Sequence, residues 1–158
     1  MKQQTGFSLI ELLVVVAIIL IILAIAVPNL MRSQMAANEA SAIESVRSII
    51  TAQATYAATY PDLGFAPTLA SLGFGALPGP NSAGLLEPPL STTGIKDGYT
   101  FNLAAPAVVP RTTYSVGTAP QNVGKTGQRA FCSDQNQAVR FDYAGSTATC
   151  LAGNNVVN

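Results

Sequence analysis

The chain contains no histidine and no tryptophan among its 158 residues. Without histidine it lacks the commonest general base and the commonest zinc ligand of proteins. Its serine and cysteine side chains therefore have no histidine partner that could activate them as nucleophiles. We predict no catalytic residue, no cofactor and no enzymatic activity.

Charged side chains are scarce as well. They make up 10% of the residues, and the formal net charge is zero. The sequence offers neither a basic face for nucleic acid nor an acidic tail, so we expect no nucleic-acid partner. Asp97, Asp134 and Asp142 are the candidates for a calcium site, but the EF-hand spacing is absent. Solvated acids in turns are the simpler interpretation, so we predict no metal site and leave calcium as the alternative.

One long hydrophobic run extends from Leu9 to Val27 and is interrupted only by Glu11. At about 1.5 Å per residue, a helix over this run is roughly 28 Å long, close to the thickness of the hydrocarbon core of a bilayer. We predict that it crosses a membrane once. Lys2 alone precedes the run and Arg32 is the first basic residue after it, so charge determines the orientation weakly, and we place Lys2 in the cytoplasm.

Glu11 is the informative residue of the run. A carboxylate at the centre of a bilayer costs about 2.5 to 3.5 kcal/mol on insertion scales, although the cost falls near the end of a span, where the side chain reaches the interface. One interpretation is a tolerated acid beside the membrane surface. The other is a buried partner for a cation, which a subunit beginning at Phe7 would supply with its own N-terminus.

The same segment also allows a secretory signal peptide. Lys2, the apolar stretch and Ala24-Ile25-Ala26 fit such a peptide with cleavage before Val27. The length of the apolar region and the position of Glu11 inside it count against this alternative. A lipoprotein anchor is excluded, because no cysteine lies near the run.

The residues around the start of the run carry a family resemblance. The string Thr5-Gly6-Phe7-Ser8-Leu9-Ile10-Glu11-Leu12 resembles the class III signal of type IV pilins and type II secretion pseudopilins. The resemblance implies that a membrane aspartyl protease cuts after Gly6 and methylates the new N-terminus at Phe7. It also implies that Glu11 neutralises the N-terminal amine of a neighbouring subunit. Such a pair loses hydration in an apolar filament core but regains energy through its mutual attraction.

This resemblance implies a structural role. The chain would be the prepilin of a type IV pilus-like extracellular filament. Its partners would be further copies of itself, the prepilin peptidase and methyltransferase, and the pilus or type II secretion assembly machinery of the inner membrane. The precursor would be a single-pass inner-membrane protein with an extracytoplasmic head, and the assembled filament would be extracellular or periplasmic. The alternatives are the major pseudopilin of a type II secretion system and a membrane-tethered binding module that never polymerises.

Helix is predicted beyond the run, since residues 29–60 contain no glycine or proline. The family often has a proline where Pro28 stands, and we predict a kink there, with the first turn of a separate second helix as the alternative. One uninterrupted helix over 7–60 would be roughly 80 Å long and would protrude from a compact domain of this mass. Apolar residues recur at steps of three or four and predict a stripe that packs on a sheet: Ile43, Val46, Ile50, Ala54 and Ala57.

The last hundred residues are polar and rich in turns. A loop rich in proline and glycine is predicted over 61–97, with a short helical turn near Thr68 to Leu72. Strand patterns follow the Asp97-Gly98 turn and predict a meander of three or four antiparallel strands. Their residues are Tyr99 to Leu103, Thr113 to Val116, Arg129 to Cys132 and Ala138 to Phe141.

The sequence thus predicts an α+β fold in which a long protruding N-terminal helix, transmembrane in its first half, packs by its second half against a small antiparallel sheet. We expect a leader over 1–6, a membrane and assembly half of the helix over 7–28, an amphipathic half over 29–60, and a head over 61–158.

The two cysteines, Cys132 and Cys150, lie close to the C-terminus. In an exported chain an even pair at this spacing predicts one disulfide, worth roughly 3 kcal/mol, whereas in a cytosolic chain the two would be free thiols. The pair would bracket the C-terminal disulfide region of the family, which is commoner in pilins than in major pseudopilins. That feature favours a pilus.

Overall fold

A computed structural model of the chain describes residues 7–153 and 155–157. Gly6, the residue expected to precede the cleavage site, lies outside the described residues. The longest element is helix α1 (Leu9–Thr59). The chain divides into two compact units, one ending at Gln34 and the other beginning at Met35, so α1 contributes to both.

The first unit consists of the N-terminal part of α1. Every side chain from Phe7 to Gln34 is exposed in the single chain. The apolar part of this helix is long enough to cross a membrane by length and composition. Pro28 lies inside α1, and the helix continues through it, so no separate second helix begins there. The kink at Pro28 stays a prediction.

In the second unit α1 buries one face. Val46 and Ile50 lie on it as predicted, and Ile43 is partly buried. Ala54 is exposed, so its place in the predicted stripe is wrong. Each four-residue step turns a helix by about 40° beyond a full rotation, and the two steps from Val46 to Ala54 carry the stripe off the buried face. The residues that do face the core are Glu39, Ala42, Ser45, Val46, Ile49, Ile50, Ala52, Gln53 and Tyr56.

A five-stranded antiparallel sheet forms the other layer, with its strands in chain order. The predicted antiparallel meander is confirmed, but the prediction of three or four strands missed the two-residue strand at 95–96. The strand predicted from Thr113 to Val116 extends instead from Ser115 to Pro120. The strands are β1 (Ile95–Lys96), β2 (Tyr99–Ala104), β3 (Ser115–Pro120), β4 (Ala130–Asp134) and β5 (Arg140–Asp142). The α+β fold class predicted from the sequence is confirmed.

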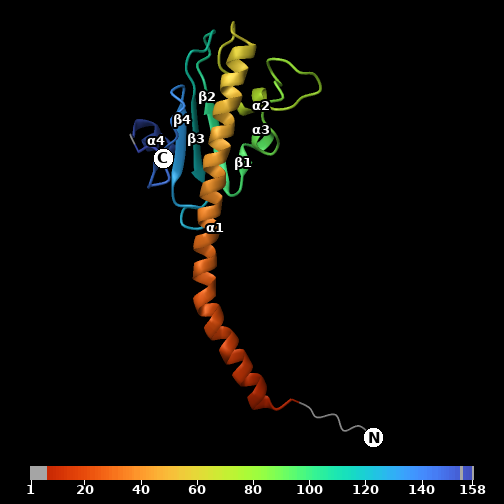
Figure 1. The fold of residues 1–158 in the computed structure, drawn as a ribbon, viewed down its shortest axis with the longest axis vertical. Coiled ribbons are helices and arrows are strands. Elements are labelled where there is room, and N and C mark those ends of the chain that lie inside the picture. The colour runs from red at the N-terminus through yellow and green to blue at the C-terminus, as the bar shows by residue number, and fades with distance from the viewer. Residues whose placement is uncertain (1–6, 154, 158) are drawn as a thin grey trace. The chain divides into compact units, whose positions relative to one another are not determined.

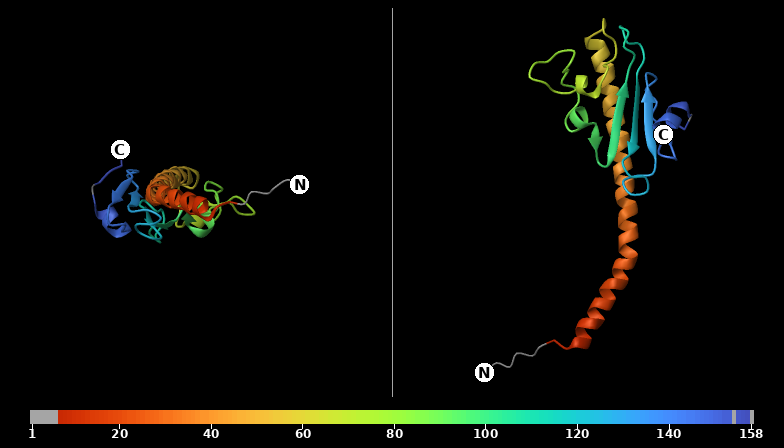
Figure 2. Two further views of the ribbon diagram at one scale, coloured as in Figure 1. Left: turned by 90° about the horizontal axis from the view of Figure 1, so that it is seen from below. Right: turned by 180° about the vertical axis from the view of Figure 1, so that it is seen from behind.

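Strand alternation places the core between the sheet and α1. In β2 the side chains of Tyr99, Phe101 and Leu103 are buried, whereas those between them are exposed. The part of α1 from Met35 onward crosses the face of the sheet on which these residues lie (Figures 1 and 2). The hairpin between β1 and β2 turns at Asp97 and Gly98, whose φ angles of 48° and 74° are those of a two-residue turn matched to strand twist.

The connection between α1 and the sheet packs along the helix. It contains α2 (Leu69–Leu72), which begins at the predicted position, with the Thr68 hydroxyl accepting from the Ser71 N–H, and α3 (Leu90–Thr93). The Gln53 amide, fully buried on α1, exchanges hydrogen bonds with the backbone of Ala66. The connection is therefore fixed to the helix by polar as well as apolar contacts.

The C-terminal residues cover the other face and the last edge of the sheet. Helix α4 (Thr147–Ala152) packs on β3, β4 and β5, and Thr147 lies directly against Gly117. Beyond α4, residues 155–157 run antiparallel to β5, with the Phe141 N–H donating to Asn155 O and the Val157 N–H to Val139 O. This pairing covers the edge of β5, which would otherwise be open.

Candidate functional site

The first candidate site is the segment from Phe7 to Val27, which we call the assembly segment. It begins with Phe7, whose side chain is 83% exposed, and Ser8, whose carbonyl accepts from the N–H groups of Glu11 and Leu12 to start α1. Its apolar side chains surround the helix on all sides, with no buried face in the single chain. A helix that is hydrophobic all round requires an apolar environment, either lipid or other helices.

Glu11 is the one acidic residue of the assembly segment. It lies in the first turn of α1, where a carboxylate interacts favourably with the helix dipole. Among the residues that the structure describes, no cation lies within ion-pair distance of it. The arrangement therefore leaves this carboxylate available to a cation that another molecule supplies.

A second polar cluster ties α1 to the sheet of the second unit. The Glu39 carboxylate accepts from the backbone N–H groups of Gln128 and Arg129, at 2.8 and 3.0 Å, and from Arg129 Nε at 2.8 Å. Arg129 Nη2 lies 2.7 Å from Glu39 Oε2. The guanidinium also sits over the rings of Phe131 and Phe141, at 5.5 and 5.6 Å from their centroids. We call this arrangement the Glu39 clasp.

The contacts of the Glu39 clasp lower the pKa of the Glu39 carboxyl. Burial alone would raise the pKa of its carboxyl, but the two backbone N–H groups and the Arg129 guanidinium outweigh burial and hold the pKa below its ordinary value. Asp134 behaves in the same way: burial raises the pKa of its carboxyl, but the Asn136 N–H and the Arg140 guanidinium, 2.6 Å away, outweigh burial and lower the pKa below its ordinary value. Both groups are therefore ionised at neutral pH.

Acid should consequently destabilise the second unit. Because the carboxyls of Glu39 and Asp134 have lower pKa values when folded than when unfolded, the unfolded chain binds more protons in acid. Their stabilisation should be complete above about pH 5 and should be lost progressively as the pH falls through about 4 toward the folded pKa values. We expect the melting temperature of the detergent-solubilised chain to fall between these limits, and to fall less in Glu39→Ala. An unchanged melting temperature down to about pH 3 would contradict this assignment.

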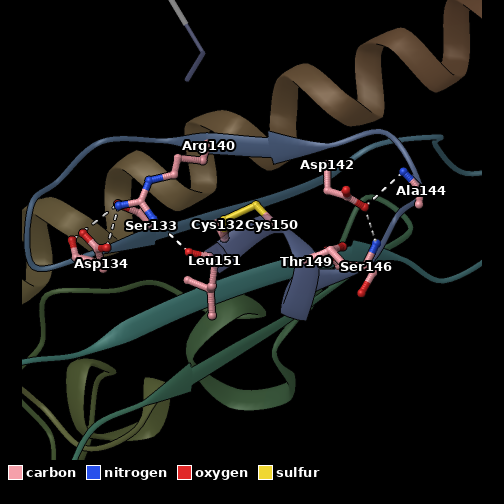
Figure 3. The surroundings of a disulfide bond; sticks show 10 residues. All are labelled: Cys132, Ser133, Asp134, Arg140, Asp142, Ala144, Ser146, Thr149, Cys150 and Leu151. Atoms are coloured by element: carbon pink, nitrogen blue, oxygen red, sulfur yellow. Dashed lines mark hydrogen bonds and ion pairs between the residues drawn. A yellow bond between two sulfur atoms is a disulfide. The ribbon is translucent and has the colours of Figure 1, made fainter. Parts of the chain in front are cut away.

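The disulfide joins Cys132 of β4 to Cys150 of α4, and both residues are fully buried (Figure 3). Around it, Arg140 bridges Asp134 and the carbonyl of Leu151. The structure therefore contains the disulfide predicted from the spacing, and it places α4 on the outer face of the sheet.

Removing this bond should lower stability. The disulfide closes a loop with a sequence separation of 18 residues. A loop of this size gives about 3 kcal/mol of stabilisation in the chain-entropy description. We expect the paired change of Cys132 and Cys150 to Ala to lower the free energy of unfolding by about this amount in a urea titration. An identical titration midpoint for the variant and for the oxidised parent would contradict the prediction.

The acidic residues considered for calcium are all engaged in protein contacts. Asp97 accepts from the Ser41 hydroxyl, Asp134 pairs with Arg140, and Asp142 accepts from the N–H groups of Ala144 and Ser146. In the described part of the chain, no group of three or more acidic, cysteine or histidine residues is placed to hold a metal ion. Only Asp97 is a solvated turn residue as predicted, whereas Asp134 and Asp142 are the last residues of β4 and β5 and are partly buried.

Comparison with known proteins addresses the N-terminal segment directly. The family model described as the prokaryotic N-terminal methylation motif matches residues 1–27. Over these residues the chain is similar to proteins that carry this N-terminal methylation motif. A curated relative, the type IV major pilin protein PilA of Myxococcus xanthus (strain DK1622), is 41% identical over 72 residues, which cover 41% of this chain and 33% of that protein. The chain thus spans about a third of the length of this pilin. No solved structure matches the chain.

The matched segment contains the residues that the sequence predicts for processing and assembly, Gly6, Phe7 and Glu11. The structure places Phe7 and Glu11 at the exposed start of α1 and Pro28 within it. The roles of Gly6 and Phe7 in processing, of Glu11 in assembly and of Pro28 in bending remain proposals. The long apolar helix and the antiparallel sheet are consistent with the pilin-like fold predicted from the sequence.

The sequence reasoning missed the Glu39 clasp. Glu39 lies in a stretch of alanine, asparagine and serine, which looks like an exposed face. The available signal was the absence of a basic residue three or four positions away that could pair with it on the helix surface. Its partner, Arg129, follows ninety positions later, and only the fold brings the two together.

Proposed function

We propose that the mature chain, starting at Phe7, is the structural subunit of a type IV pilus-like filament that assembles outside the cytoplasm through its apolar N-terminal helix. The observation that carries the proposal is the assembly segment. Its side chains are exposed on every side of α1, and its one carboxylate has no cation nearby in the described residues. Lipid covers the apolar surface of this helix in the precursor, and a bundle of identical helices covers it in a filament.

Glu11 supplies specificity to this assembly. Apolar helices slide along one another with little resistance, because any register buries a similar area. A carboxylate fixed in the first turn of α1 pairs with the N-terminal amine of Phe7 in a neighbouring copy, and this pairing selects one register. Methylation keeps that amine basic, so the positive charge is retained.

Processing and partners follow from the proposal. The prepilin peptidase cuts after Gly6 and methylates Phe7 while the assembly segment is in the inner membrane. The pilus assembly machinery then extracts the subunit into the filament, and the second unit stays on the extracytoplasmic side. The similarity to the M. xanthus major pilin and to the N-terminal methylation motif supports this course.

The second candidate is the major pseudopilin of a type II secretion system, which uses the same signal. The disulfide between Cys132 and Cys150 favours a pilus, because a C-terminal disulfide is commoner in pilins. Electron microscopy of wild-type and deletion cells separates the two. We expect surface filaments that disappear on deletion while protein secretion continues. Loss of secretion without loss of any surface filament would favour the pseudopilin.

A further inference from the structure

Two loops of the second unit expose large apolar side chains that the single chain leaves uncovered. The β2–β3 loop, residues 105–114, carries Val108 and Val109, which are 78% and 48% exposed. The β3–β4 loop, residues 121–129, carries Val123, which is 53% exposed. Strand β3 runs from the first loop to the second, so they lie at opposite ends of the sheet (Figures 1 and 2).

The β3–β4 loop has a fixed backbone. Asn122 and Thr126 bond each other through both backbone and side chain, and the Gly124 N–H donates to Gly127 O at 2.9 Å. The Asn38 side chain on α1 donates to Thr126 O at 2.8 Å. These contacts hold the loop against α1, while the side chains of Val123 and Lys125 stay exposed. A surface that is already ordered loses little conformational entropy when it binds.

The β2–β3 loop is held equally firmly at the other end. Arg111 donates from Nε to Pro106 O at 3.1 Å, and its backbone N–H donates to Leu63 O at 2.9 Å. The loop is thereby joined to the turn that follows α1, which carries the exposed side chain of Asp62. This end of the unit therefore carries two exposed valines and, in the adjoining turn, one exposed carboxylate.

Each end carries one exposed side chain whose charge is opposite to that of the exposed side chain at the other end. Lys125 and Asp62 are both exposed, and neither takes part in an ion pair among the described residues. Asp97 and Arg111 also keep their charges, but their side chains are held by hydrogen bonds within the unit, to the Ser41 hydroxyl and to two carbonyls respectively. One end thus carries an exposed ammonium and an exposed valine on one loop, and the other carries two exposed valines on a loop joined to the turn with the exposed carboxylate.

We propose that the β3–β4 loop of one copy docks on the β2–β3 loop of the next copy, with Val123 against Val108 and Val109 and with Lys125 facing Asp62. The inference rests on the proposed function, because parallel copies in a filament can bring opposite ends of the unit face to face. A head-to-tail contact that does not close generates an open helical array. A stable complex buries roughly 800 Å² of surface on each partner, and two short loops bury far less than that. The contact between the loops therefore sets the register of the subunits, while α1 holds the subunits together.

Cysteine cross-linking tests the contact in filaments. The variant carrying both Val108→Cys and Val123→Cys is expressed in place of the parent chain, and sheared filaments are treated with a short bismaleimide. Because both side chains are exposed, the changes should leave the fold intact, and the native disulfide is fully buried. We expect a ladder of dimers, trimers and larger species on a denaturing gel. Each single variant should stay monomeric, as should Val108→Cys combined with Leu77→Cys, an exposed residue on a different loop.

Three other outcomes would overturn the inference. Filaments of normal appearance without a ladder would show that these ends do not meet while leaving the proposed function intact. Dimers from either single variant would show that like ends meet. Wild-type cells without any filament would overturn the proposed function, and this contact with it.

A charge exchange gives an independent readout. Asp62→Lys and Lys125→Asp should each lower filament yield severalfold, because each brings like charges together. The double variant should recover most of the yield. Normal yields from both single variants, or no recovery in the double variant, would contradict the facing of Lys125 and Asp62.

Discussion

Replacing Glu11 with Ala should abolish filaments while leaving the protein in the membrane. The substitution removes a charge from the assembly segment, so membrane insertion becomes slightly easier. In the filament, however, the N-terminal amine of each neighbouring copy loses its partner within an apolar bundle. An uncompensated charge of this kind costs about 3 kcal/mol or more, which corresponds to roughly a hundredfold weaker addition of each subunit.

The measurement compares sheared surface protein with membrane protein by immunoblot and counts filaments by electron microscopy. Ile10→Ala serves as the matched control, since Ile10 lies in the same turn and is 68% exposed but carries no charge. We expect the control to form filaments and Glu11→Ala to form none, at equal amounts in the membrane. Normal filaments from Glu11→Ala would refute the role assigned to this carboxylate.

Replacing Glu39 with Ala should be among the most destabilising single changes in the second unit. It removes three hydrogen bonds and one ion pair, and it leaves two N–H groups and the guanidinium of Arg129 without their acceptor. Breaking a buried pair costs about 3 to 5 kcal/mol. Because the Arg129 side chain is 36% exposed, water compensates in part, and we expect about 2 to 4 kcal/mol.

The same helix provides the control for this prediction. Glu44 pairs with Arg47 at 3.8 Å, and both side chains are more than half exposed. Glu44→Ala should therefore change the free energy of unfolding by less than about 1 kcal/mol. Thermal melts of the detergent-solubilised chain followed by circular dichroism should show a decrease on the order of 10 °C for Glu39→Ala and little change for Glu44→Ala. Equal melting temperatures for the two variants would contradict the importance of the Glu39 clasp.

The parts of the fold that follow from local chemistry could be predicted from the sequence. The apolar run and the absence of glycine and proline after Pro28 predict α1, Asp97-Gly98 predicts the turn before β2, and Thr68 predicts the start of α2. In each case the signal lies within a few residues of the structure that it specifies. The disulfide between Cys132 and Cys150 could also be predicted, since two cysteines in an exported chain can form only one intramolecular disulfide.

The features that could not be predicted depend on partners far along the chain. Gln53 faces the core because its amide satisfies the backbone of Ala66, and polar residues on a helix are ordinarily assigned to the exposed face. Glu39 is buried because a loop from the far end of the sheet brings Arg129 to it. Residues 155–157 carry too short a pattern to predict a strand, yet they pair with β5. Buried polar contacts of this kind arise only once the fold is complete.

The most direct test of the account is the mass and N-terminal sequence of the mature protein, taken from its native membrane or from sheared surface material. Cleavage after Gly6 predicts that the chain starts at Phe7 and that this residue carries one methyl group on its amine. Such a result would show that the assembly segment is retained in the mature subunit. A chain that starts at Val27 would mean that the apolar run is a discarded signal peptide, and the proposal of a filament subunit would then be wrong.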